Sequence, residues 1–146
     1  MRKVSRSALV PYTAAQMYAL VENFEAYPDF LPWCIGATLH FRNDTTLEAS
    51  LEMQRGGIRK SFRTRNTLHP GHAMSIALMD GPFKHLAGDW RFEQLGDDGS
   101  KVTLELEFEF ESRVMDALFG RYFEGTCNSL IDSFTRRADK IYGMQR

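Results

Sequence analysis

Alternation of apolar and polar residues is the strongest pattern in this chain, and it predicts strands. In 102–111 every even position is apolar and every odd position is Thr or Glu, which is typical of a strand with one face on a core and the other in water. Residues 46–54 and 58–68 follow the same rule, and Gly56-Gly57 between them suits the positive φ angles of a tight hairpin. The predicted sheet has seven strands in all. The other four are expected at 2–10, 34–42, 74–78 and 86–92.

Two segments show helical spacing instead. Thr13 and Gln16 fit the capping-box pattern, so a short helix is expected from there to about Glu22. A much longer helical region is expected over 112–142, because apolar residues recur there in two adjoining stripes. The stripes are Val114, Leu118, Tyr122, Leu130, Phe134, Ala138 and Ile141, and Met115, Phe119, Phe123, Cys127 and Ile131.

An apolar helix surface this broad has to be covered, and one antiparallel sheet can do so by curling around it. We therefore expect an α+β fold in which a seven-stranded antiparallel sheet curls around the long C-terminal helix, with two short helices between strands 1 and 2. No linker, repeat or composition shift divides the 146 residues, so a single domain over 1–146 is expected. Gly120 and Gly125 each cost the helix about 1 kcal/mol relative to alanine. They predict a bend, or a close approach of the backbone to another element or a ligand, with close packing on the sheet as the simplest case.

Composition and charge narrow the functional classes. The 18 Lys and Arg residues against 19 Asp and Glu residues give a net charge of −1, which disfavours a strongly basic nucleic-acid-binding domain and leaves a local basic patch open. The N-terminus lacks the apolar segment of a secretory signal, and no apolar run approaches the ~18 residues of a membrane span. We therefore expect a cytoplasmic protein with reduced thiols, which at most touches the inner membrane from one side.

The sequence contains no pattern that indicates catalysis or metal binding. The four histidines lack ligand spacing, and Cys34 and Cys127 form no CxxC pair and have no neighbouring base. Nucleotide-binding and nucleophile-elbow motifs are absent as well. The glutamates of 102–111 alternate outward and are expected to be solvated. We accordingly assign no catalytic residue, no metal and no cofactor.

The inward side chains of the sheet and the long helix are the most informative feature. A curved sheet leaves space against a helix unless large side chains close it, so we expect an apolar cavity of roughly 300–1,000 Å³, with core packing as the alternative for any one residue. Thr64, Asn66 and Tyr122 share the inward side, and a bound carbonyl or hydroxyl could pair with a buried polar tip of this kind. The other inward residues are Leu51, Met53, Phe62, Met74, Ile76, Leu78, Trp90, Phe92, Leu106, Phe108, Phe119, Phe123 and Leu130.

Three arginines point outward on the strand 58–68, beside a hairpin partner that carries two glutamates. Cross-strand ion pairs explain this arrangement. An RNA-facing patch, extended by Arg55 and Lys60, is the alternative. The arginines are Arg59, Arg63 and Arg65, and the glutamates are Glu48 and Glu52.

Several aromatic and proline-containing motifs follow one another along the chain. They are residues 5–12, Tyr27–Cys34, Asp80–Lys84, Trp90–Phe92, Phe108–Phe110 and Phe119–Phe123. As a set they resemble the coenzyme-Q-binding and RatA-like branch of the START-like (SRPBCC) superfamily, over essentially the whole chain. The resemblance implies a helix-grip fold with no catalytic constellation of its own. It also places Phe30 and Trp33 at the mouth of the cavity.

For the function, the resemblance implies first a non-catalytic lipid-binding protein. Such a protein holds ubiquinone or a related isoprenoid lipid in its cavity, supports respiration and contacts the membrane surface transiently. The expected ligand-binding residues are Phe30, Trp33, Leu51, Met53, Phe62, Thr64, Ile76, Leu78, Trp90, Leu106, Phe108, Phe119, Tyr122 and Phe123.

The alternative is a toxin of a toxin–antitoxin pair that binds the large ribosomal subunit and blocks subunit association. In that case Arg59, Arg63 and Arg65 would contact RNA. DNA is not an expected partner under the lipid-binding or the ribosome-binding interpretation. Polyketide cyclase or dehydrase activity, a label often given to this superfamily, is disfavoured. Thr64 and Tyr122 are isolated candidates for it and form no convergent acid–base set.

Overall fold

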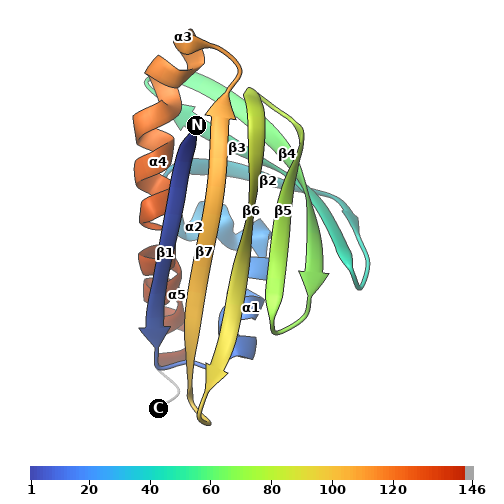
Figure 1. Ribbon diagram of the computed structural model, residues 1–146, viewed down its shortest axis with the longest axis vertical. Coiled ribbons are helices and arrows are strands. Elements are labelled where there is room, and N and C mark those ends of the chain that lie inside the picture. The colour runs from blue at the N-terminus through green and yellow to red at the C-terminus, as the bar shows by residue number, and fades with distance from the viewer. Residues whose placement is uncertain (144–146) are drawn as a thin grey trace.

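In the computed structural model, which describes residues 1–143, seven antiparallel strands form one sheet in the order β1-β7-β6-β5-β4-β3-β2. The sheet curls around the C-terminal helices, which lie against one of its faces (Figure 1). The predicted architecture is confirmed, and residues 144–146 of the expected domain lie outside the described residues. The strands are β1 (Arg2–Val10), β2 (Cys34–Arg42), β3 (Thr46–Arg55), β4 (Ile58–His69), β5 (Ala73–Asp80), β6 (Phe83–Leu95) and β7 (Gly99–Phe110).

The alternation of the sequence sets the two faces of the sheet. On β7 every second side chain from Ser100 to Phe110 is buried. At the β3–β4 hairpin Gly56 and Gly57 adopt φ angles of 57° and 82°, and the resulting register places Leu51 opposite Phe62. Because the side-chain period of a strand is two, this register turns the apolar sets of both strands toward the helices.

Two short helices connect β1 to β2, as expected. They are α1 (Ala14–Glu22) and α2 (Tyr27–Phe30), joined by the 3-10 turn η1 (Phe24–Ala26). The capping box is present: Thr13 Oγ1 accepts from the Gln16 N–H at 3.1 Å, and Gln16 Oε1 accepts from the Thr13 N–H at 2.9 Å. This connection carries the chain across the sheet, so β1 and β2 lie at its opposite edges.

The C-terminal helical region is less regular than its spacing predicts. It consists of α3 (Arg113–Met115), the π-helical segment η2 (Asp116–Gly120), α4 (Arg121–Asn128) and α5 (Leu130–Tyr142). The helix is interrupted at Ser129, whose backbone N–H and Oγ both donate to the carbonyl of Gly125, at 3.2 and 3.1 Å. A Cβ at Gly125 would have no atom within 4 Å, so the expectation of close packing is wrong for this glycine.

Gly120 does have a close neighbour, and it is an ion pair. A Cβ at Gly120 would lie 2.6 Å from Arg2 Nη2 and from Asp116 Oδ1. The Arg2 guanidinium donates to both carboxylate oxygens of Asp116 at 3.0 Å and to Glu124 at 2.8 Å. Glycine at this position therefore lets an arginine of β1 reach across and fasten η2 and α4 to the sheet edge.

One stripe of the C-terminal helices is buried against the sheet. It consists of Met115, Phe119, Phe123, Cys127, Ile131, Phe134 and Ala138. Val114, Leu118 and Ile141, which were predicted to be inward, are instead 68%, 40% and 37% exposed. A helix turns about 100° per residue, so a sheet that covers one stripe leaves the neighbouring positions on the flank.

Candidate functional site

An interior cavity of about 90 Å³ lies between the concave face of the sheet and the helices. It is far smaller than the roughly 300–1,000 Å³ of a usual small-molecule site, so the predicted size is wrong for this structure. The physical reason is the bulk of the side chains around it. The cavity is lined by Phe24, Tyr27, Trp33, Ala49, Leu51, Phe62, Thr64, Asn66, Met74, Ile76, Leu86, Trp90, Leu106, Phe123, Cys127, Leu130 and Phe134.

Part of the predicted ligand-binding set lines this cavity. Phe24 and Tyr27, which sequence reasoning missed, come from η1 and α2, where no periodic pattern marks them as inward. Cys127 and Phe134 also line the cavity. The sequence places both on the apolar stripes of the C-terminal helix, so the expected burial of those stripes was a signal that could have included them in the predicted lining. The predicted residues found in the lining are Trp33, Leu51, Phe62, Thr64, Ile76, Trp90, Leu106 and Phe123.

The remaining predicted residues lie elsewhere. Four of them belong to a filled apolar cluster under α3 and α4: Met53, Leu78, Phe108 and Phe119. In this cluster the Phe108 and Phe119 side chains are fully buried. The Phe108 ring meets the Phe123 ring edge-on, with centroids 4.9 Å apart. Aromatic packing has thus closed this half of the interior.

Phe30 and Tyr122 are only half-buried and do not line the cavity. The Arg137 guanidinium lies 5.1 Å from the Phe30 ring centroid, and the Arg55 guanidinium lies 4.5 Å from the Tyr122 ring centroid. Both rings take part in cation–π contacts with arginines. The prediction of an inward Tyr122 is wrong because its position falls on the flank of α4, next to the buried Phe123.

Two polar side chains of β4 reach the cavity. Thr64 is 9% exposed. Asn66 directs its Nδ2 to Met74 Sδ at 3.5 Å, and its buried Oδ1 has no hydrogen-bond partner within residues 1–143. An unpaired buried acceptor costs about 1–3 kcal/mol. The amide oxygen therefore offers a hydrogen-bonding position to a ligand hydroxyl.

The titratable side chains of the cavity lining are Tyr27 and Cys127. Burial raises the pKa of the Tyr27 hydroxyl, which donates to the carbonyl of Val21 at 2.5 Å. Burial also raises the pKa of the Cys127 thiol to about 12. Both groups therefore stay protonated at neutral pH, and neither is suited to nucleophilic or general-base chemistry there.

The thiols provide a first prediction. Burial raises the pKa of Cys34 to about 11 and that of Cys127 to about 12, so at pH 8 their thiolate fractions are at least about 100-fold below that of a free cysteine. We expect iodoacetamide to modify both residues at least about 100-fold more slowly in the native protein than in the guanidinium-unfolded protein. Intact-mass spectrometry over time measures this. Equal rates in the two states would contradict the buried placement.

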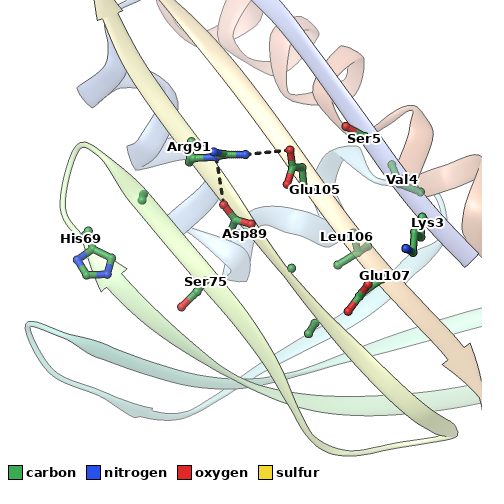
Figure 2. Close-up of a pocket in the computed structure, with 13 residues that line it drawn as sticks. Lys3, Val4, Ser5, His69, Ser75, Asp89, Arg91, Glu105, Leu106 and Glu107 are labelled. Carbon is green, nitrogen blue, oxygen red and sulfur yellow. Dashed lines mark ion pairs between the residues drawn. The ribbon is translucent and has the colours of Figure 1, made fainter. Parts of the chain in front are cut away.

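A larger hollow of about 820 Å³ lies on the opposite, outer face of the sheet, where it is open to solvent. Figure 2 shows Arg91 lying between Asp89 and Glu105, at 3.2 and 2.9 Å. Glu107, also on this face, pairs with His85 at 3.1 Å. The β7 carboxylates Glu105 and Glu107 point outward as predicted. Most of the charged side chains around the hollow form ion pairs with neighbouring side chains.

The predicted arginine stripe also lies on the outer face, and its charges are paired. Arg63 and Arg65 both contact Glu48, at 3.0 and 3.3 Å, and Arg59 lies 3.6 Å from Glu52. The cross-strand ion pairs of the first interpretation are confirmed. These ion pairs engage the guanidinium groups that an RNA-facing patch on β4 would need for contacts with phosphates.

Within residues 1–143, no three His, Cys, Asp or Glu side chains come together in a group that could hold a metal ion. Over the same range no helix has both the length and the apolar character needed to cross a membrane.

Comparison with known proteins gives consistent matches over most of the chain. Residues 10–135 match the family model described as polyketide cyclase / dehydrase and lipid transport. The ribosome association toxin RatA of Vibrio cholerae serotype O1 is 43% identical over 143 residues, which cover 98% of this chain and 99% of that protein. The mitochondrial coenzyme Q-binding protein COQ10 of Dictyostelium discoideum is 27% identical over 90% of this chain and 66% of its own length.

Solved structures share the fold. The 18 kDa protein CC1736 from Caulobacter crescentus has a TM-score of 0.76 at 31% identity and covers 98% of this chain and 99% of its own. A START superfamily protein from Mycobacterium smegmatis has a TM-score of 0.75 at 21% identity, with coverage of 95% and 98%. The Zhui aromatase/cyclase from Streptomyces sp. R1128 has a TM-score of 0.79 at 14% identity, with coverage of 95% and 94%. The last two likenesses show a START-like fold alone, because one fold hosts many functions.

Proposed function

The chain belongs to the polyketide cyclase / dehydrase and lipid transport family, and we propose that it is a non-catalytic cytoplasmic protein that binds the large ribosomal subunit and blocks its association with the small subunit. The observation that carries this proposal is the likeness to the ribosome association toxin, which extends over nearly the full length of both chains. The likeness to the coenzyme Q-binding protein is weaker and covers less of that relative. The motif resemblance to a START-like branch that contains both kinds of protein is thereby confirmed.

The chemistry of the interior supports a function without catalysis, although the fold is shared with an aromatase/cyclase. The cavity is lined by aromatic and aliphatic side chains, and its titratable groups, Tyr27 and Cys127, keep their protons at neutral pH. An acid–base reaction needs a group whose pKa lies near the working pH. We therefore propose no catalytic residue and no cofactor for this protein.

Sedimentation tests the ribosome proposal. The purified full-length protein, centrifuged through a sucrose cushion with separated subunits, is expected to pellet with the large subunit and to stay in the supernatant alone or with the small subunit. Because phosphate contacts release counterions, binding through about five single-strand phosphate contacts should weaken about 100-fold between about 50 and 200 mM salt. Failure to pellet with large subunits at the lower salt would refute the proposal.

A second function is favoured by one observation, the unpaired Oδ1 of Asn66 in an apolar cavity. We propose that the cavity holds an apolar small molecule, of which ubiquinone or a related isoprenoid lipid is the expected class; the hydroxyls of the reduced, hydroquinone form are the groups that can donate to Asn66 Oδ1. A cavity of about 90 Å³ has to widen to admit a quinone ring. Widening would come from movement of α2 and of the rings at its edge, since the Tyr27, Phe30 and Phe134 rings pack there with centroids 5.2–6.1 Å apart.

Ligand content tests this second function. Organic extraction of the purified protein followed by mass spectrometry should yield a quinone or another isoprenoid lipid, and added quinone should slow the alkylation of Cys127, which lines the cavity. Cys34 does not line the cavity and serves as the internal control. Repeated absence of any lipid, together with unchanged Cys127 alkylation, would count against it.

A further inference from the structure

A groove lies on the outside of the C-terminal helices. It has a volume of about 510 Å³ and runs between the loop before β2 and one flank of α4 and α5. We call it the helix groove. Its lining residues are Pro32, Trp33, Arg121, Tyr122, Gly125, Thr126, Ser129, Ser133 and Arg136.

Two acidic groups of the C-terminal helices are already engaged: Glu124 with Arg2, and Asp139 with the hydroxyl of Tyr12. Arg121 and Arg136, which line the helix groove, each lie one helical turn before one of these carboxylates. Because Glu124 and Asp139 are bound to Arg2 and Tyr12, they do not form ion pairs with the two groove arginines.

The arginines around the helix groove lack carboxylate partners. Arg2, Arg63 and Arg91 are examples of the paired kind, each within 3.0 or 3.2 Å of a carboxylate oxygen. In the part of the chain that the structure describes, Arg121 and Arg136 line the groove and have no carboxylate within ion-pair distance. Within residues 1–143, Arg55, which lies over the groove residue Tyr122, is likewise without a carboxylate partner, as are Arg6, Arg113 and Arg137 outside the groove lining.

The hydroxyl groups of the groove complement these cations. Thr126 Oγ1 donates to the carbonyl of Phe123 at 2.8 Å, and Ser129 Oγ donates to the carbonyl of Gly125 at 3.1 Å. Their protons are used within the helix, so the hydroxyl oxygens face the groove as acceptors. The groove thus combines guanidinium donors with neutral acceptors.

This combination fits RNA. Phosphate oxygens only accept hydrogen bonds and match the arginines, whereas a ribose 2′-hydroxyl can donate to Thr126 or Ser129. The backbone N–H groups of an acidic peptide and the headgroup hydroxyls of phosphatidylglycerol can donate to these oxygens as well, so the preference for RNA comes from the Tyr122 ring and from the proposed ribosome association. The Tyr122 ring, with Arg55 on it, adds a surface of the kind on which unpaired bases stack.

We propose that the helix groove is the RNA-binding surface of this protein, in which Arg121 and Arg136 contact phosphates and the Thr126 and Ser129 oxygens accept from 2′-hydroxyls. This inference rests on the proposed ribosome association and names the surface that performs it. It replaces the arginine stripe of β4, whose charges are paired with Glu48 and Glu52. A net charge of −1 is compatible with it, because only the local charge matters for phosphate contacts.

A matched pair of double variants tests the assignment in the full-length protein. Arg121→Gln with Arg136→Gln removes two charges from the groove, and Arg59→Gln with Arg65→Gln removes two charges from β4. We expect the groove variant to bind the large subunit at least about 10-fold more weakly, with the slope of log affinity against log salt reduced by about 1.4 for two lost single-strand contacts. The β4 variant should bind as the wild-type protein does. Circular dichroism and thermal unfolding verify that both are folded.

A second measurement identifies the chemistry of the occupant. A labelled single-stranded RNA should bind more tightly than DNA of the same sequence, and Ser129→Ala should narrow that difference. If the wild-type protein binds subunits and the groove variant binds equally well, the groove assignment is wrong while the ribosome proposal stands. If the wild-type protein binds neither subunits nor RNA, both fail. Binding to phosphatidylglycerol vesicles or to polyglutamate, without binding to RNA, would also overturn the assignment.

Discussion

Replacement of Phe123 by alanine is expected to lower the free energy of unfolding by about 3–5 kcal/mol, the range for a fully packed phenylalanine. The ring is 4% exposed and joins α4 to the sheet. It meets the rings of Phe108 at 4.9 Å and Phe83 at 5.4 Å between centroids. Urea unfolding followed by circular dichroism measures the loss, with a constant m-value to show that the same surface unfolds.

Phe41→Ala is the matched control for this substitution. Phe41 lies on the edge strand β2 and is 46% exposed, so its removal should change the stability by no more than about 0.5 kcal/mol. A loss below about 1 kcal/mol for Phe123→Ala would show that the aromatic cluster is not packed as described.

Gly88→Ala is the second substitution with a large expected effect. Gly88 lies opposite Leu106 in the β6–β7 pairing. A Cβ there would be 2.3 Å from the carbonyl oxygen of Glu105 and 2.9 Å from the Cα of Leu106. Because these are backbone atoms of a paired strand, the sheet itself has to shift, at a cost of about 1–3 kcal/mol or more. Thermal unfolding should show a clear fall in the melting temperature.

Gly125→Ala provides a control of opposite sign. A Cβ at Gly125 meets no atom within 4 Å and lies inside α4. Alanine there should stabilise the protein by up to about 1 kcal/mol, through helix propensity alone. A melting temperature that rises for Gly88→Ala, or falls for Gly125→Ala, would contradict the placement of that glycine.

Much of the fold follows from local patterns. The alternation along β7 and the Gly56-Gly57 turn together specify the strands, their inward faces and the hairpin register, because a one-residue slip would turn Leu51 to solvent. The capping box marks the start of α1 for a similarly local reason. The π segment and the interruption at Ser129 depend on contacts with β1 and on backbone geometry, neither of which leaves a periodic signal in the sequence.

The candidate sites were harder to predict. The alternation of odd and even positions along each strand identifies which side chains point inward. The volume of the cavity, however, depends on the curvature of the sheet and on how the rings of Phe108, Phe119 and Phe123 pack together. A shift of one position on a helix moves a side chain by about 100°, which separates the outward Tyr122 from the buried Phe123. The helix groove joins Trp33 to Arg121 and Arg136, residues that only the tertiary fold brings together.

The interior and the surface of this protein therefore have different roles. Most of the interior is filled by side chains, and among the described residues Asn66 Oδ1 is the one fully buried side-chain polar atom of the cavity lining that lacks a hydrogen-bond partner. The exterior has arginines without carboxylate partners along one helix flank. A protein of this kind can recognise a polyanion with its helices while its core accounts for its stability.

Reassociation of ribosomal subunits is the most direct test of the central proposal. Separated small and large subunits are mixed at a magnesium concentration that favours joining, with and without the wild-type protein, and the fraction of joined ribosomes is read from a sucrose gradient. The account predicts that the protein, when present in molar excess, lowers that fraction and migrates with the free large subunit. An unchanged fraction of joined ribosomes, with the protein remaining at the top of the gradient, would contradict it.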